Sequence, residues 1–216
     1  MRWLLLSLAA CSAEPTRLYS VPVTADPVDG AGWTTDDGVT IALTSATITF
    51  ADLRLHTPPA AIVAWPTLLP TAYAHPGAAI RGETAGELLG TWTLDLLGGP
   101  VQLGTASCYL GAFATASLQL AGALSLRGSA TPAGGEPFAF TFDADLSDMV
   151  EDLLFETTLT SASALTLSVH SASLLAPVDW STEPAGDALT LTDGALANTM
   201  AFGARSADTW TLTVSP

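Results

Sequence analysis

The sequence predicts an all-β fold, an antiparallel β-sandwich of about eight to ten strands with one or two short helices. Three observations support this prediction. Apolar and polar residues alternate with a period of two along most of the chain, helical periodicity is sparse, and roughly 200 residues suit one sandwich-type domain. We therefore expect residues 34–216 to form a single β domain.

The alternation is clearest between Phe138 and Leu146. Apolar side chains occupy every second position there, and Thr141, Asp143 and Asp145 fall between them. This pattern is typical of an antiparallel strand with one buried face and one solvated face. It recurs at Trp92–Leu96, Leu118–Leu120, Leu124–Leu126, Leu165–Val169 and Trp210–Val214.

The stretch from Val39 to Leu55 also alternates, but its inward face changes twice. Apolar residues take odd positions from 39 to 43, even positions from 46 to 50, and odd positions at 53 and 55. A one-residue slip in a strand sends every later side chain to the opposite face. A continuous strand therefore needs bulges near Thr44-Ser45 and Ala51-Asp52, unless one of these sites is a turn.

Helix is expected in two places. Asp193 is positioned to cap a short helix that carries Leu196 and Met200 on one face and ends at Gly203. Residues Asp148 to Leu154 predict one or two further helical turns.

A proline-rich stretch follows the first long strand. Prolines 58, 59, 66, 70 and 76 remove backbone donors between Thr57 and Pro76, so we interpret this stretch as a long excursion from the sandwich. Loops of this length in a compact domain are functional or mobile. We expect the segment Thr57 to Gly82 to contact a ligand or partner through Trp65 and Tyr73, because an exposed indole can stack on a sugar ring.

The first residues have the order of a secretory signal, with Arg2, an apolar run from Trp3, and small residues before Cys11. Leu8-Ala9-Ala10-Cys11 resembles the lipobox of bacterial lipoproteins, in which the cysteine becomes the lipidated first residue. The resemblance implies a signal peptide at 1–10 and an acylated (palmitate-bearing) Cys11. The prolines and glycines between Glu14 and Trp33, which include Pro22 and Pro27, predict a tether over 11–33. The alternative interpretation is a buried N-terminal strand that ends in cysteine.

The residues after Cys11 bear on location. Ser12, Ala13 and Glu14 follow it, with no aspartate directly after the cysteine. This order resembles the outer-membrane sorting pattern of well-studied lipoproteins. It implies a lipid-anchored protein at the outer membrane of a Gram-negative bacterium.

The chain is strongly acidic. It has 6 basic and 21 acidic residues, a formal net charge of -15, and contains no lysine. Loss of the leader would remove Arg2 and give 5 minus 21, or -16. Such a surface repels phosphate backbones and anionic headgroups, so we expect no nucleic-acid partner. Cations, neutral glycans and basic envelope proteins fit better, although high net charge also serves solubility alone.

Several enzyme classes lack their motifs. The sequence contains no G-x-S-x-G, H-E-x-x-H or C-x-x-C, and the absence of lysine removes phosphate-loop and Schiff-base chemistry. We therefore do not expect an enzyme. If lipid occupies Cys11, Cys108 has no disulfide partner, and its small apolar surroundings predict a buried, inert thiol.

Histidine suggests one metal hypothesis, because imidazole is a common ligand of copper and zinc. The residues that would combine are His75, Glu83, Glu87 and His56. The segment Ala74 to Leu97 also resembles an Ala-His-Pro-Gly element of uncharacterised Gram-negative lipoproteins. A second histidine tends to follow that glycine, where this chain has Ala78, which weakens the implied metal site. The alternative is that His75 and the glutamates are solvated loop residues.

Calcium is a second metal hypothesis, since hard oxygen donors are abundant. The aspartates concerned are Asp26, Asp29, Asp36, Asp37, Asp143, Asp145 and Asp148. None of these runs has EF-hand spacing, and Asp36-Asp37-Gly38 is an ordinary turn sequence.

Together these observations predict a lipid-anchored envelope protein that acts as a non-catalytic binding module. The alternative function is the handling of copper or zinc, with no cofactor otherwise expected.

Overall fold

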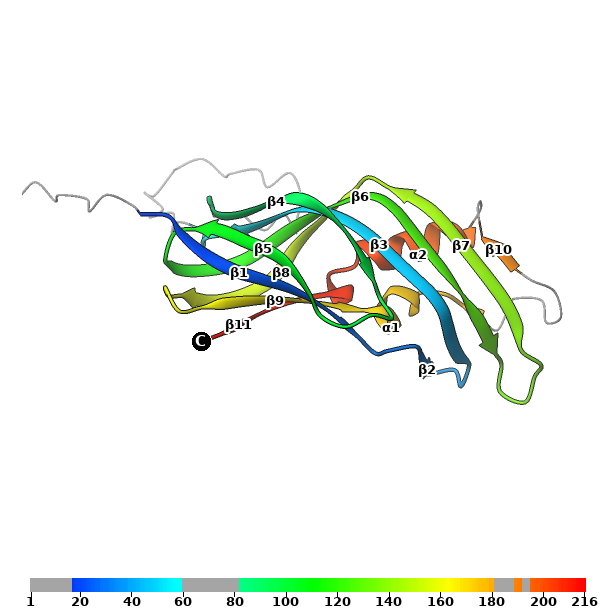
Figure 1. Cartoon of the computed structure of the whole chain (residues 1–216). Helices are drawn as coiled ribbons and strands as arrows, with labels where there is room; N and C mark the ends of the chain where they lie inside the picture. Colours follow the sequence, from blue (N-terminus) through cyan, green and yellow to red (C-terminus); the bar gives the residue numbers. More distant parts are fainter. Residues whose placement is uncertain (1–16, 60–81, 181–188, 192–194) are drawn as a thin grey trace, which may run out of the picture.

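The computed structural model of the chain describes residues 17–59, 82–180, 189–191 and 195–216 (Figure 1). Its strands are β1 (Tyr19–Val28), β2 (Gly32–Thr34), β3 (Thr40–His56), β4 (Thr84–Asp95), β5 (Val101–Cys108), β6 (Gly111–Thr131), β7 (Phe138–Leu146), β8 (Met149–Leu159), β9 (Ala164–His170), β10 (Leu189–Leu191) and β11 (Trp210–Ser215). Its helices are α1 (Ser171–Leu175), α2 (Ala195–Arg205) and the 3-10 turn η2 (Ala207–Thr209). The all-β class is confirmed.

All these strands belong to one sheet, which curls on itself (Figure 1). Its order is β10-β7-β6-β3-β4-β5-β1-β9-β11, with β2 attached to β3 and β8 attached to β6. β4 and β5 share only two residue pairs, Gly86 with Cys108 and Glu87 with Ser107. Phe50 of β3 packs against Trp210 of β11, so strands on the two sides of this junction face each other across the core as two layers of one continuous sheet.

Most neighbouring strands are antiparallel, as predicted, but two pairs are parallel. β1 pairs with β9, and β7 pairs with β10, in parallel register. Parallel pairing needs a long crossover connection, and both pairs join strands that are distant in the sequence. Alternation in the sequence reveals which face of a strand is buried but not the direction of its neighbour.

Both bulges predicted in the long strand β3 are confirmed. Its register against β6 shifts between Leu43 and Ser45, and its register against β4 shifts between Ala51 and Leu53. At the second shift Asp52 adopts φ 44°, a left-handed conformation that aspartate tolerates better than most residues. The bulges let Ile41, Ile48 and Leu53 all reach the core, where each is fully buried.

The structure corrects the expected tether. Residues 19–28 form β1, which is hydrogen-bonded between β5 and β9, and Val21, Val23 and Ala25 are buried. Pro22 and Pro27 suggested a linker, but each lies where β1 has a ladder partner on one side only. Proline is tolerated there because no donor is missing from a second ladder. The β domain therefore includes residues 19–34.

The helix expected over Asp148–Leu154 is a second correction, because Asp148 lies in the connection between β7 and β8 and the other residues lie in strand β8. Val150, Leu153 and Phe155 are buried, so the spacing changes from three to two along the strand. The cause is a bulge at Asp152, where φ is 58° and the pairing with β6 shifts register. The bulge interrupts the two-residue period of the strand, so its buried apolar residues fall at a spacing that is also typical of a helix.

The predicted helix that carries Met200 is confirmed as α2, with Met200 fully buried and the end of the helix two residues beyond Gly203. Gly203 is required by close packing, because a Cβ there would overlap the carbonyl of Leu174 in α1. Two side chains satisfy carbonyls at the C-terminus of α2. Thr209 Oγ1 donates to Gly203 O at 2.7 Å, and Trp210 Nε1 donates to Ala204 O at 2.9 Å.

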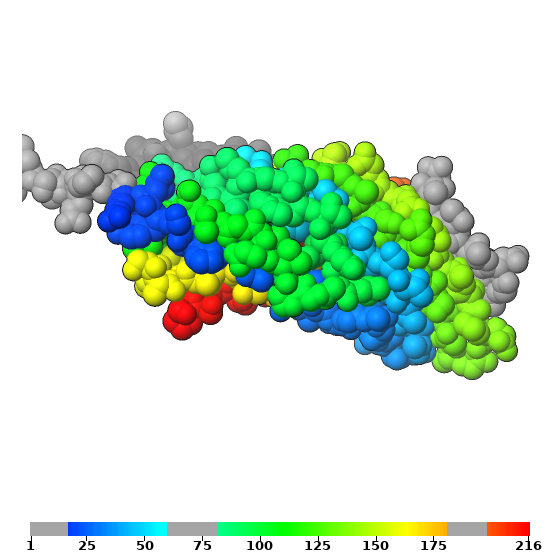
Figure 2. Space-filling view, in the orientation of Figure 1, coloured from blue at the N-terminus to red at the C-terminus, as the bar shows by residue number. Residues whose placement is uncertain are grey.

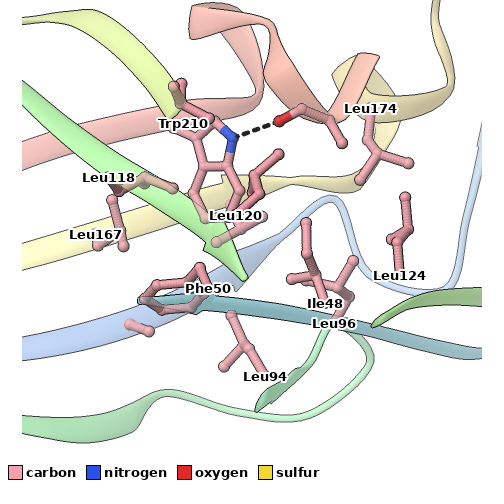
Figure 3. Packing of buried hydrophobic residues seen from close by; sticks show 14 of the residues in the cluster. Ile48, Phe50, Leu94, Leu96, Leu118, Leu120, Leu124, Leu167, Leu174 and Trp210 are labelled. Atoms are coloured by element: carbon pink, nitrogen blue, oxygen red, sulfur yellow. Dashed lines mark hydrogen bonds between the residues drawn. The ribbon is translucent and has the colours of Figure 1, made fainter. Parts of the chain in front are cut away.

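Trp210 also reaches across the core (Figure 3). Its ring meets Phe50 of β3 edge-on, with ring centroids 5.6 Å apart, and is 2% exposed. Phe50 in turn lies 5.8 Å from Trp92 of β4. This row of aromatic rings joins the two layers of the curled sheet to helix α2.

The first testable prediction concerns this tryptophan. Trp210→Phe keeps a ring but leaves Ala204 O without its donor, so we expect a loss of about 1–3 kcal/mol in the free energy of unfolding. Trp210→Ala also opens a cavity and should cost about 3–5 kcal/mol. Trp92→Phe is the matched control and should cost less, because it also removes an indole hydrogen bond, that of Trp92 Nε1 to Leu103 O at 3.0 Å, but from a partly buried site. Denaturant unfolding measures all three, and a Trp210→Phe protein as stable as the parent would contradict the argument.

Candidate ligand-binding groove

A surface groove of about 440 Å³ lies between the β2–β3 turn and helix α1. From the turn it is lined by Trp33, Thr34, Thr35, Asp36 and Asp37, and from the α1 side by Ala172, Ser173, Ala176 and Val178. Typical ligand pockets have volumes of about 300–1,000 Å³. The groove is therefore large enough to hold a small molecule.

The β2–β3 turn is held in shape by its own hydrogen bonds. Thr35 N donates to Val39 O at 2.9 Å, and Thr35 Oγ1 accepts from Val39 N at 3.1 Å. Gly38 closes the turn with φ 78°, which glycine adopts without strain. Asp36 and Asp37 lie exposed at its tip. The turn therefore presents two carboxylates from a fixed backbone.

Helix α1 is fixed to the end of β1. Asp29 Oδ2 accepts from Ala172 N at 3.1 Å, and Ser171 Oγ donates to Val28 O at 3.2 Å. Asp29 has φ 75° and also lies 3.9 Å from Nδ1 of His170. These bonds place Ser173 opposite the β2–β3 turn.

The lining has a mixed chemical character. Trp33 is partly buried and packs against the core, so its indole is a rigid amphipathic surface. The lining also includes the hydroxyl residues Thr34, Thr35 and Ser173 and the carboxylates of Asp36 and Asp37. None of the described residues that line this groove has a basic side chain. The arrangement favours a neutral or cationic ligand rich in hydroxyl groups and disfavours an anion.

His56 of the metal hypothesis is 7% exposed, and hydroxyl groups bond its ring. Its Nε2 lies 2.9 Å from Ser117 Oγ, and its Nδ1 lies 3.3 Å from Thr84 Oγ1. Both ring nitrogens therefore have protein partners. His56 lies in β3 and bonds to Thr84 of β4 and Ser117 of β6, so it links three strands.

The two glutamates of that hypothesis are exposed on the β4 side. The carboxylate of Glu87 lies 3.8 Å from Arg54 Nε, and the backbone of Glu83 accepts from Thr57 N at 3.0 Å. This bond joins the residue that follows β3 to the residue that precedes β4, so the two ends of the proline-rich stretch lie side by side. Across the described ranges, no three His, Cys, Asp or Glu side chains come together in a way that would hold a metal ion.

Other predicted site residues, Cys11, Trp65, Tyr73 and His75, lie outside the described residues, as does most of the segment Thr57 to Gly82.

The aspartates of the calcium hypothesis are distributed over the molecule and several have partners. Asp143 lies 3.3 Å from Arg127, Asp148 lies 2.6 Å from Arg205, and Asp29 accepts from α1. Cys108 is fully buried, as predicted, and burial raises the pKa of its thiol to about 11. The thiol is therefore protonated at neutral pH, which makes it a poor nucleophile and metal ligand.

The sequence did not predict the groove. The turn at Asp36-Asp37-Gly38 was predicted, but Trp33 was not among the expected contact residues. A tryptophan directly before an acidic turn was the available signal. Its meaning depends on α1, which packs beside it from much later in the chain.

No protein-family model, curated protein or solved structure matches the chain. In the part of the chain that the structure describes, no helix is both long and apolar enough to cross a bilayer.

The second testable prediction separates a structural from a metal-binding role of His56. His56→Ala leaves the hydroxyl of Ser117, which is 1% exposed, without its partner, so we expect a loss of about 1–3 kcal/mol or more in the free energy of unfolding. Ser117→Ala in the same chain should recover part of it. Thermal unfolding with and without added Zn²⁺ or Cu²⁺ provides the second readout. A metal-dependent rise in Tm that disappears in His56→Ala would contradict the structural role and support the metal hypothesis.

Proposed function

We propose that this chain is a non-catalytic binding module of the bacterial cell envelope, anchored by lipid at Cys11, and that it binds a neutral or cationic, hydroxyl-rich ligand such as a glycan. The observation that carries the binding proposal is the groove beside Trp33. It combines an amphipathic ring, hydroxyl groups and two carboxylates on a fixed backbone.

Electrostatics supports this class of ligand. The chain carries a formal charge of -15, and Asp36 and Asp37 line the groove. A surface of one sign attracts opposite charges and repels like charges over about one Debye length, roughly 8–10 Å in physiological salt. An amino sugar or an uncharged glycan enters such a groove without the penalty that a phosphate or a carboxylate ligand would meet.

The lipid anchor rests on the lipobox resemblance at Leu8–Cys11. Acyl chains bind a bilayer through hydrocarbon burial, about 0.8 kcal/mol per methylene, so no protein surface is needed for attachment. Strand β1 begins at Tyr19. The roughly eight residue steps from Cys11 to Tyr19 can span at most about 28 Å. An anchored domain would therefore be held close to the membrane with its groove free.

The third testable prediction is the acylation itself. The full chain, expressed in a Gram-negative host with a labelled fatty acid, should take up label and partition with outer-membrane fractions. Cys11→Ser should lose both properties, because it removes the thiol that is acylated. Cys108→Ser is the matched control and should keep both. Absence of label in the parent protein, together with membrane partitioning of Cys11→Ser, would refute the anchor.

The fourth testable prediction concerns the groove. Oligomers of N-acetylglucosamine and of glucosamine, added to the purified protein, should bind with an affinity that falls at least tenfold in Trp33→Ala and less in Trp33→Tyr. Asp36→Asn with Asp37→Asn should weaken the cationic glucosamine oligomer more than the neutral one, because the carboxylates interact with charge.

Glu136→Gln is the control for this titration, since Glu136 is an exposed carboxylate that does not line the groove. Calorimetry measures each affinity. Sugar binding that is indifferent to Trp33→Ala, or no binding of either oligomer, would refute the groove as a glycan site.

A further inference from the structure

Exposed apolar side chains gather at the end of the molecule where β1 begins. Leu18 is 56% exposed, and Tyr109 and Leu110, in the connection between β5 and β6, are each 37% exposed. Leu18 precedes Tyr19, whose partner in β5 is Cys108. By the same register, Leu18 lies beside Tyr109. Figure 2 shows the start of β1, in blue, at one extremity of the molecule. We call Leu18, Tyr109 and Leu110 the apolar end patch.

Acidic side chains are sparse around this patch, although the chain as a whole is strongly acidic. The start of β1, the β5–β6 and β8–β9 connections and the end of β11 lie at this end of the sheet. The sequence ranges that contain them, 17–23, 107–116, 157–178 and 209–216, have no aspartate or glutamate. Glu83, just before β4, is an exposed carboxylate that borders the patch. This end is therefore less repellent to anionic groups than the rest of the surface.

Arg17 supplies positive charge next to the patch. Its guanidinium carbon lies 5.6 Å from the centre of the Tyr19 ring. The other described arginines, at positions 54, 127 and 205, lie 3.8, 3.3 and 2.6 Å from carboxylates, whereas no carboxylate of the described residues forms an ion pair with Arg17. An arginine beside apolar side chains suits a membrane surface, where its charge meets headgroup phosphates and its stem lies along hydrocarbon.

The patch lies on the side from which the proposed anchor reaches the domain. The roughly seven residue steps from Cys11 to Leu18 can span at most about 25 Å. The groove beside Trp33 lies at the other end of β1, where Val28 O accepts from Ser171 Oγ of α1 at 3.2 Å. A strand rises about 3.3 Å per residue, so β1 separates the patch from the groove by about 30 Å.

A bilayer surface fits the patch better than a second copy of the chain does. A second copy would bring another -15 of formal charge, and like charges that approach each other disfavour association. Three apolar side chains bind a bilayer only weakly by themselves. A short lipid tether holds them at high local concentration next to that bilayer, so even a weak contact is populated.

We propose that the apolar end patch contacts the bilayer that holds the lipid at Cys11, so that the domain stands on this end and the groove beside Trp33 faces away from the membrane. Leu18 and Leu110 enter the boundary between headgroups and acyl chains, and the Tyr109 hydroxyl stays among the headgroups. This inference rests on the lipid anchor proposed above and adds the orientation of the anchored domain.

The fifth testable prediction uses the full chain on vesicles of phosphatidylcholine. One sample is the acylated protein purified from a Gram-negative host, with Cys11→Ser as its reference. The other is unacylated chain coupled through Cys11 to a maleimide lipid, and its reference carries a maleimide without lipid. Cys108 is fully buried, so it is shielded from the reagent. Hydrogen exchange measured by mass spectrometry locates the contact.

We expect the backbone amides of residues 17–20 and 108–112 to exchange about threefold more slowly, or slower still, in both lipid-bearing samples than in their references, because the bilayer limits their access to water. The β2–β3 turn and α1 should keep their exchange rates, since the groove faces away from the membrane.

Leu18→Ser combined with Leu110→Ser should abolish most of this slowing, because it replaces the two side chains that enter the bilayer. Leu89→Ser combined with Leu154→Ser is the matched control and should leave the slowing unchanged. These two leucines are 62% and 79% exposed on β4 and β8, away from the patch. Thermal unfolding establishes that each variant is folded.

Three results would overturn the proposal: unchanged exchange at the patch in the coupled sample, equal slowing after Leu18→Ser with Leu110→Ser, or slowing centred on the β2–β3 turn and α1. Slowing that appears in the references as protein concentration rises would indicate a second copy on the patch and would also overturn it. The coupled sample separates this inference from the anchor. Slowing there without acyl label in the host refutes the anchor alone, whereas acyl label without slowing refutes the contact alone.

Discussion

The structure depends on one buried tryptophan that connects three parts of the fold. Trp210 begins β11, donates to the carbonyl of Ala204 at the end of α2, and packs edge-on against Phe50 of the opposite layer. A sheet that curls on itself needs large side chains to fill the space between its layers, and aromatic rings supply the most area per residue. Because the indole donates to the carbonyl of Ala204, that carbonyl keeps a hydrogen bond where α2 ends inside the protein.

Aspartates occupy irregular points of the sheet. Asp29, Asp52 and Asp152 are the non-glycine residues with positive φ in the described ranges. Asp29 fixes α1 beside the groove, and Asp152 lies at the bulge of β8 that is followed by the exposed Leu154. Aspartate tolerates the left-handed region better than most residues. Part of the acidic composition therefore shapes the backbone as well as the electrostatic field.

The groove beside Trp33 combines charge and shape. Its described lining residues include two carboxylates and no basic side chain, so the groove disfavours anions and favours neutral or cationic groups. It lies between a turn and a short helix, which suits a compact molecule.

The sequence by itself determined the β class, the buried face of most strands, the two bulges of β3, the buried thiol of Cys108 and the acidic field. These properties follow from local alternation and composition, which a chain carries before it folds. Tertiary structure decided that residues 19–28 belong to the core, that His56 is held by hydroxyl groups, and that Trp33 faces α1. Each of these depends on which distant strands become neighbours, and alternation specifies the face of a strand but not its partner.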